Sequence, residues 1–305
     1  MGVLTGAPAV MIWRRISDLG AAKNFFTKTM SWPRVGTNQY AVVSDTGNVL
    51  LGHWVQALLA GGCSKLDFNK FDLVSNPGSE LVVASRSMGP AVASIRAVTK
   101  LPMLPPTNGT TSFVDPDGNY TALIRSKGLL KGQAARKLAA LLKTGVSGVG
   151  KARRALANPL VGYTLLVTDL KASARFYRNV LGLRALARVT DSISFDIGTM
   201  ILTLKREPAL GLVRSLNKRR RLEGDWVVFH VKDIEKDVKA LKGKGVKFPK
   251  GIEESVHGLG AYFTDLDGYS YGLWVPPDKH DAIDYFPELQ RILKSVAWLK
   301  VAGAR

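Results

Sequence analysis

The stretch VTDLKASARFYRNVLGL, residues 167–183, has a counterpart earlier in the chain in ISDLGAAKNFFTKTMSW, residues 16–32. In both stretches an apolar residue lies two positions before the Asp of Asp-Leu, and an aromatic pair follows the Asp at the same distance. The two stretches lie 151 residues apart. The similarity suggests that one structural unit occurs twice.

The similarity continues beyond these two stretches. Gly47 and Gly198 keep the spacing of 151, and FVDPDGNY at 113–120 matches FTDLDGYS at 263–270 at a spacing of 150. The spacing between matching residues changes by only one over about a hundred positions, which favours duplication over chance. A chain of 305 residues is also long enough for two domains, each with its own core.

The second half alternates between strand and helix patterns. LVGYTLLV at 160–167 is typical of a strand, and Asp169 is a good N-cap for a helix that ends near Gly182. Two further strands form a hairpin near Gly198. The same order then recurs from DWVVFHV at 225–231, where Asp233 precedes the second helix. Each half therefore contains two strand-helix-strands units.

These residues resemble the vicinal oxygen chelate superfamily, which includes glyoxalase I, bleomycin resistance proteins and extradiol dioxygenases. The resemblance is strong for 160–276 and weaker, but in register, for 8–125, where the N-terminal domain is divergent. It implies an α+β fold of four βαβββ modules, paired so that each half forms a curved, mixed, eight-stranded sheet around a cavity. The expected divisions are a glyoxalase-like domain at 8–126, a basic linker with an amphipathic helix at 127–159, a second glyoxalase-like domain at 160–276 and a helical tail at 277–305.

Enzymes of this superfamily hold a divalent metal with His, Glu or Gln side chains from four equivalent strand positions. The resemblance places those positions at Met11, Gly52, Glu80 and Ala122 in the first half, and at Gly162, Thr203, Trp226 and Gly272 in the second. Only Glu80 could bind a metal, and one carboxylate does not make a metal site. We therefore expect no metal, no cofactor and no catalytic residues, and we lean against an enzyme.

The expected cavity of the second half has an apolar and aromatic lining. His230 shares strand parity with Trp226, so both should face the cavity, whereas His53 should face away in the first half. A neutral or anionic aromatic molecule would suit such a cavity, although the indoles could simply fill it. The candidate ligand-binding residues are Thr203, Trp226, His230, Ser270 and Trp274.

The chain carries a formal charge of +19, and residues 127–159 contain eight basic side chains and no acidic ones. Apolar residues recur at helical spacing over 129–143, which predicts an amphipathic helix. Such basic elements attract an anionic partner, namely an acidic protein surface, RNA or an anionic membrane face. A linker whose charges are simply solvated is the alternative. The candidate docking residues are Lys131, Arg136, Lys137, Lys143, Lys151, Arg153, Arg154, Lys218, Arg219, Arg220 and Arg221.

Three functions remain open on this basis. The leading expectation is a catalytically silent subunit of a larger assembly. The second is a metal-free protein that binds or sequesters a small molecule, as in the bleomycin resistance branch. The third is a glyoxalase-like lyase or dioxygenase with unusual metal ligands. The sequence has neither a secretory signal pattern nor a bilayer-spanning apolar run, so we expect an intracellular protein, in the cytoplasm or inside an organelle.

Overall fold

The structure is a computed structural model of the whole chain. It describes residues 2–16, 18–37, 41–55, 78–98, 103, 106, 108–116, 119–127, 130–147, 159–207, 225–277 and 283–302. Seven of the candidate docking residues lie outside these ranges: Lys151, Arg153, Arg154, Lys218, Arg219, Arg220 and Arg221.

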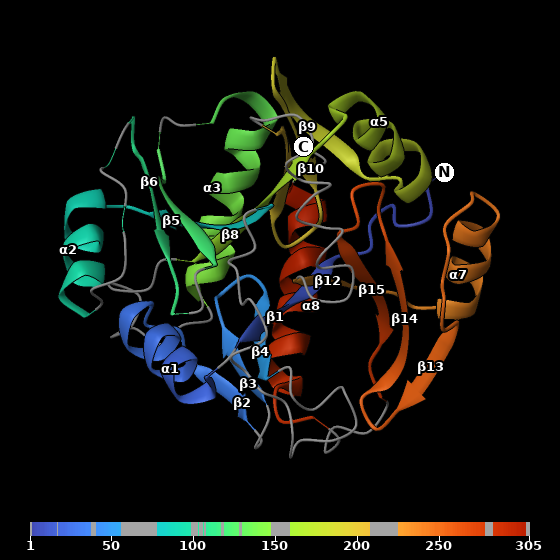
Figure 1. Cartoon of the computed structure of the whole chain (residues 1–305), viewed down its shortest axis with the longest axis horizontal. Helices are drawn as coiled ribbons and strands as arrows, with labels where there is room; N and C mark the ends of the chain where they lie inside the picture. Colours follow the sequence, from blue (N-terminus) through green and yellow to red (C-terminus); the bar gives the residue numbers. More distant parts are fainter. Residues whose placement is uncertain are drawn as a thin grey trace, which may run out of the picture.

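Four modules follow one another along the chain (Figure 1). The first contains β1 Ala9–Ile16, α1 Leu19–Asn24, the π-helical turn η1 Phe25–Thr29, β2 Arg34–Thr37, β3 Ala41–Asp45 and β4 Leu50–Val55. The second contains β5 Ser79–Ser85, α2 Met88–Val98, β6 Thr110–Val114 and β7 Tyr120–Arg125. The third contains β8 Leu160–Val167, α5 Leu170–Arg175, the π-helical turn η4 Phe176–Leu181, β9 Arg184–Val189, β10 Ser192–Asp196 and β11 Ile201–Arg206. The fourth contains β12 Trp226–His230, α7 Ile234–Lys242, β13 Ile252–Ser255, β14 Gly258–Thr264 and β15 Ser270–Val275.

The helix starts predicted from sequence are confirmed in their capping geometry. The Asp18 carboxylate accepts hydrogen bonds from the backbone N–H groups of Gly20 and Ala21. The Asp169 carboxylate accepts the equivalent bonds from Lys171 and Ala172, which lowers the pKa of Asp169. Each capped helix continues into a π-helical turn that carries the aromatic pair into the core.

The modules pair across the two halves of the sequence. Modules one and four form an eight-stranded sheet in the order β13-β14-β15-β12-β1-β4-β3-β2, and modules two and three form a seven-stranded sheet in the order β6-β7-β5-β8-β11-β10-β9. The junctions are antiparallel, with Trp13 opposite Trp226 and Glu80 opposite Thr164. The expectation that each half forms its own eight-stranded sheet is therefore wrong, and neither 8–126 nor 160–276 contains one complete sheet.

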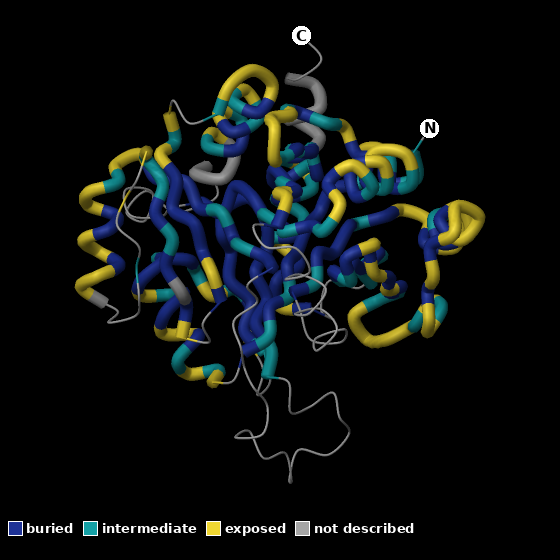
Figure 2. Tube along the Cα trace, turned by 45° about the horizontal axis from the view of Figure 1, so that its top comes forward, coloured by how far each residue is buried: buried dark blue, intermediate teal, exposed yellow. Residues whose placement is uncertain are grey.

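Two helices outside the modules each cover one face of a sheet, which we call its inner face. The linker helix α3, Gly132–Ser147, packs on the seven-stranded sheet, and the C-terminal helix α8, Phe286–Ala302, packs on the eight-stranded sheet (Figure 1). In α3 the predicted helical spacing is confirmed, because Ala134, Leu138 and Leu141 are buried against the sheet. The opposite faces share one extensive core with the module helices, and Figure 2 shows this buried interior.

Among the described residues, no helix combines the length and the apolar character needed to cross a membrane.

Candidate functional site

The four metal-ligand positions implied by the resemblance gather from different halves of the chain. On the eight-stranded sheet they are Met11 on β1, Gly52 on β4, Trp226 on β12 and Gly272 on β15, four adjacent strands. None of these side chains is a metal ligand. The donor set at this position does not fit a divalent ion.

The second set lies on the seven-stranded sheet and consists of Glu80, Ala122, Gly162 and Thr203. Glu80 is the one acidic group, and one carboxylate with one hydroxyl is a poor site for a hard or borderline ion. Over the residues that the structure describes, no three His, Cys, Asp or Glu side chains lie together as a metal site would require.

A row of half-buried polar side chains crosses the inner face of the seven-stranded sheet at Glu80. Glu80 lies opposite Thr164, Thr164 opposite Thr203, and Thr203 opposite Ser194 on successive strands. The Ser112 hydroxyl donates to Glu80 Oε1 at 2.8 Å. Burial raises the pKa of Glu80, an effect that the Ser112 hydrogen bond and the charge of Lys205 oppose.

On the eight-stranded sheet, aromatic side chains lie around two of the implied ligand positions, Gly52 and Trp226. The Trp226 ring lies 5.5 Å from the Trp54 ring and 5.2 Å from the Tyr262 ring, measured between centroids. The Trp13 ring lies over Gly52, so that a Cβ at Gly52 would stand 2.4 Å from a ring carbon. The position that would carry a metal ligand is thus a glycine over which an indole lies.

The five predicted ligand-binding residues do not form one site. Trp226 is the strand partner of Ser270, and His230 is the strand partner of Trp274, all on the eight-stranded sheet. Thr203 lies on the other sheet. Burial, followed by the charge of Lys232, lowers the pKa of His230. The prediction that these four residues bind a ligand remains a prediction, and Thr203 belongs with Glu80 instead.

His53 has the orientation expected from strand parity. It is fully buried on the face away from α8, and its ring stacks on Phe26 at a centroid distance of 4.0 Å. Burial and the nearby charge of Arg14 hold the pKa of His53 well below its usual value. A neutral core histidine is the consequence.

The described docking candidates differ in their surroundings. Lys131, just before α3, and Arg136 and Lys143 on α3 are exposed. Lys137 turns toward the sheet, where its ammonium group pairs with Asp196 at 2.8 Å and donates to the carbonyl of Gly198. The side chain of Lys137 is only 9% exposed, so it anchors α3 to the sheet.

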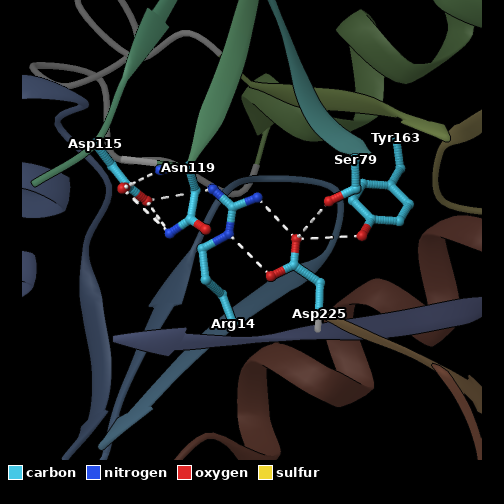
Figure 3. Close-up of polar contacts among 6 residues, drawn as sticks. All are labelled: Arg14, Ser79, Asp115, Asn119, Tyr163 and Asp225. Atoms are coloured by element: carbon cyan, nitrogen blue, oxygen red, sulfur yellow. Dashed lines mark hydrogen bonds and ion pairs between the residues drawn. The ribbon is translucent and has the colours of Figure 1, made fainter. Parts of the chain in front are cut away.

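A buried ionic network that sequence reasoning missed joins the two sheets (Figure 3). Arg14 on β1 makes a two-pronged contact with Asp225, at 3.1 and 2.8 Å, and its remaining nitrogen contacts Asp115 at 3.3 Å. Tyr163 of β8 and Ser79 of β5 donate to the same Asp225 oxygen. Burial opposes the charge of Arg14, but Asp225 and Asp115 outweigh it and raise the pKa of Arg14. The sequence signal that could have indicated this network is the presence of Arg14 in the otherwise mostly apolar strand AVMIWRRI.

A second buried network lies in the repeated FTDLDGYS segment. Asp265 accepts a hydrogen bond from the Tyr177 hydroxyl, and the Tyr177 and Tyr271 hydroxyls contact each other. Burial raises the pKa of Asp265 to about 7, against the opposing hydrogen bonds from Tyr177 and the backbone N–H of Tyr269. Asp267 accepts hydrogen bonds from Thr168, which follows β8, and from Ser173 of α5, so the two Asp residues hold the loop to η4, to α5 and to the end of β8. The duplicated F-x-D-x-D-G pattern marks this loop in the sequence.

Comparisons with known proteins agree with this architecture. Residues 160–271 match the model of the Glyoxalase/Bleomycin resistance protein/Dioxygenase superfamily. The fold is similar to that of a putative dioxygenase from Bacillus subtilis, with a TM-score of 0.60 and 14% identity over 95% of this chain and 96% of that chain. It is also similar to glyoxalase I from Zea mays, with a TM-score of 0.59 and 16% identity over 93% of this chain and 95% of that chain.

No curated protein matches the chain in a sequence search. The matched segment contains the third module and most of the fourth, and both similar structures extend over nearly the whole chain. Residues 160–271 therefore belong to the superfamily of glyoxalases, bleomycin resistance proteins and dioxygenases, and the chain as a whole has the fold of these two structures.

Proposed function

We propose that this chain is a catalytically silent, metal-free member of its superfamily, and that it acts as a binding or architectural subunit whose basic surface engages an anionic partner. The observation that carries the proposal is that the chain's own helices pack on part of each inner face and bury a ligand position there. Met11, one of the ligand positions, is buried in the cluster formed with α8, and Ala122, another, is buried in the cluster formed with α3.

The chemistry of the eight positions supports the same conclusion. Three are glycines, two are apolar aliphatic residues, one is an indole, and only Glu80 and Thr203 carry side-chain oxygens. A superfamily enzyme needs several N or O donors around one ion, with open positions for substrate oxygens. Neither sheet supplies that set.

The basic surface supports the choice of an anionic partner. Arg136 and Lys143 on α3 and Lys131 just before it are exposed, while the apolar side of α3 packs on the sheet. Since the chain has a charge of +19, its field favours association with a negative surface at low ionic strength.

Metal retention tests catalytic silence. Purified protein is dialysed against Zn²⁺, Ni²⁺ or Mn²⁺, then against buffer, and the bound metal is measured. We expect less than one equivalent, with no difference between the wild type and Glu80→Gln. Stoichiometric metal that is lost in Glu80→Gln would contradict the proposal and favour an enzyme with unusual ligands.

Charge reversal on α3 tests docking. The tagged protein is isolated from its native cells at low and high salt, and the comigrating mass is measured by sizing and mass spectrometry. We expect a large complex that dissociates as salt rises and that is lost with Lys131→Glu/Arg136→Glu/Lys143→Glu. A matched control, Lys236→Glu/Lys239→Glu/Lys242→Glu on α7, makes the same change in charge on exposed lysines elsewhere. Equal loss in both variants, or migration of the wild type alone at about its own mass of 33.1 kDa, would contradict docking through α3.

A further inference from the structure

We infer that Lys171, Arg175 and Arg178, which we call the basic stripe, form a docking surface for the phosphate backbone of double-stranded DNA. All three side chains are exposed, on α5 and on the π-helical turn η4 that continues it. The inference goes beyond the proposed subunit role, because α5 packs on the face of the seven-stranded sheet opposite to the face on which α3 packs.

The stripe is a single row of cations along the helix. Its residues follow one another at steps of four and three, so their side chains lie on the same side of the helix. Leu170, Ala174 and Tyr177 precede them by one residue each, and all three are buried. The exposed row therefore lies directly beside the row that faces the core, and at a rise of about 1.5 Å per residue it is about 10 Å long.

The core side of the same helix is fixed by hydrogen bonds. The Ser173 hydroxyl donates to Asp267 at 2.9 Å. The Tyr177 hydroxyl donates to Asp265. The backbone that carries the stripe is therefore ordered before any partner arrives, which lowers the entropic cost of binding.

Positive charge on this helix is not neutralised by neighbouring acids. None of the three stripe side chains forms an ion pair in the part of the chain that the structure describes. The carboxylate at the start of the helix, Asp169, is bonded to backbone N–H groups instead. At the far end, the ammonium group of Lys244 lies 2.9 Å from the carbonyl oxygen of Asn179 and 3.2 Å from that of Val180, which adds a fourth cation. The resulting field attracts an extended polyanion.

The equivalent helix of the first module lacks the stripe. At the spacing of 151, its corresponding residues are Gly20, Asn24 and Thr27, none of which is charged. Its two lysines, Lys23 and Lys28, are five residues apart, so they lie on different sides of the helix. Since both modules have the same Asp cap and the same π-helical turn, the fold itself does not require the three cations.

The surroundings of the stripe favour a nucleic-acid duplex over a protein or a membrane. No exposed large apolar side chain of the described residues belongs to α5 or η4. Leu266 is exposed in the turn that is bonded to α5, but one side chain is not an apolar patch. Protein interfaces have an apolar core and membrane-bound helices insert apolar side chains, whereas nucleic-acid interfaces are polar and strongly positive. The absence of an exposed aromatic ring from these two elements disfavours a single strand, whose bases need a stacking platform.

The position of the helix favours duplex DNA over duplex RNA. α5 and η4 lie at the periphery of the molecule, with the stripe exposed (Figure 1). The wide major groove of B-form DNA admits a helix, whereas the deep, narrow major groove of A-form RNA excludes side chains. A helix at the DNA groove brings one flank against the phosphates of one strand, which places the stripe next to them.

The salt dependence of DNA binding tests the inference on the isolated full-length protein. Fluorescence anisotropy of a labelled DNA duplex measures the binding constant between about 50 and 200 mM salt. We expect Arg175→Gln/Arg178→Gln to weaken binding about tenfold at the lower salt concentration. The slope of log K against log salt should become shallower by about 2, because each lost phosphate contact removes about 0.9. Should this variant fail to fold, Lys171→Gln alone decides, with an expected change in slope of about 0.9.

The matched control is Lys23→Gln/Lys28→Gln, which makes the same change in charge on two exposed lysines of the equivalent helix. Its affinity and slope should stay close to those of the wild type. Equal changes in the two variants would overturn the stripe, because the charge of the whole chain would then bind the DNA. Tighter binding of an RNA duplex of the same sequence, or loss of binding to phosphatidylserine vesicles without loss of DNA binding in the stripe variant, would overturn the choice of DNA. These outcomes leave the subunit role untouched, because every variant lies outside α3.

Discussion

The indole of Trp13 lies over Gly52 on the neighbouring parallel strand, and a Cβ at Gly52 would stand 2.4 Å from its ring. The resemblance to the superfamily implies a metal-ligand position at Gly52. Restoring a ligand there is thus sterically blocked by a residue of the adjacent strand.

We expect Gly52→Ala to lower the free energy of unfolding by about 1–3 kcal/mol, because overpacking a buried strand displaces its neighbours. Chemical denaturation monitored by circular dichroism measures the change. The control is Gly89→Ala in α2, where a Cβ would meet nothing within 4 Å and helix propensity favours Ala by about 1 kcal/mol. A Gly52→Ala variant as stable as the wild type would show that the Trp13 ring moves freely.

We expect a large loss of stability when the buried Arg14, the cation of the network, is replaced by an uncharged residue. Arg14→Met leaves the buried carboxylates of Asp225 and Asp115 without their counter-ion, and we expect unfolding to become easier by about 3–5 kcal/mol. Adding Asp225→Leu should recover part of that loss, since it removes one of the stranded charges. The control is Arg184→Met, whose 62% exposed side chain pairs with Asp196 and should cost under about 1 kcal/mol. Equal effects of the two Arg substitutions in urea unfolding would contradict this account.

Asp265 predicts a pH dependence of stability with a definite sign. Its pKa of about 7 in the folded chain exceeds the unfolded value of about 3.9, so the folded state binds more protons between these values. The contribution of Asp265 to stability is therefore present below about pH 4 and is lost as pH rises toward 7, by up to about 1.4 kcal/mol per pH unit.

Urea unfolding of the wild type and Asp265→Asn at pH 5 and pH 8 tests this sign. The free energy of unfolding of the wild type, relative to that of the variant, should be higher at pH 5 than at pH 8. The helix cap Asp169 serves as the control, because its lowered pKa places its own titration below pH 5. For Asp169→Asn the difference from the wild type should be the same at both pH values. A constant difference for Asp265→Asn as well would mean that Asp265 is ionised throughout.

The attachment of α8 depends on Arg291. Its guanidinium donates to Asp45 Oδ1 at 2.7 Å and to the carbonyl of Gly47 at 2.9 Å. We expect Arg291→Ala to lower the free energy of unfolding by about 1.5–3 kcal/mol, because these hydrogen bonds are charge-assisted. Hydrogen exchange of α8 should increase, which reports detachment rather than global unfolding. Lys294→Ala removes an exposed cation from the same helix and should leave exchange unchanged.

Local structure was largely determined by the sequence. The repeated Asp-Leu motif predicted both helix caps, because a carboxylate before a helix satisfies its free N–H groups whatever the tertiary setting. The apolar spacing in the linker predicted α3, and strand parity placed Trp226 and His230 on one face and His53 on the opposite face of its own strand. These features depend on periods of two or about four residues, which the sequence displays directly.

Long-range pairing was decided by the tertiary structure alone. Backbone hydrogen-bonding groups at a strand edge are the same for every sequence. The sequence of β1 therefore does not indicate that β12 is its neighbour, and the sequence of β5 does not indicate that β8 is. That choice separated Thr203 from Trp226 and brought Trp54 to Trp226 from the other half of the chain. The apolar side of a helix likewise does not specify which surface it covers, and only the folded chain placed α3 and α8 on the inner faces of the two sheets.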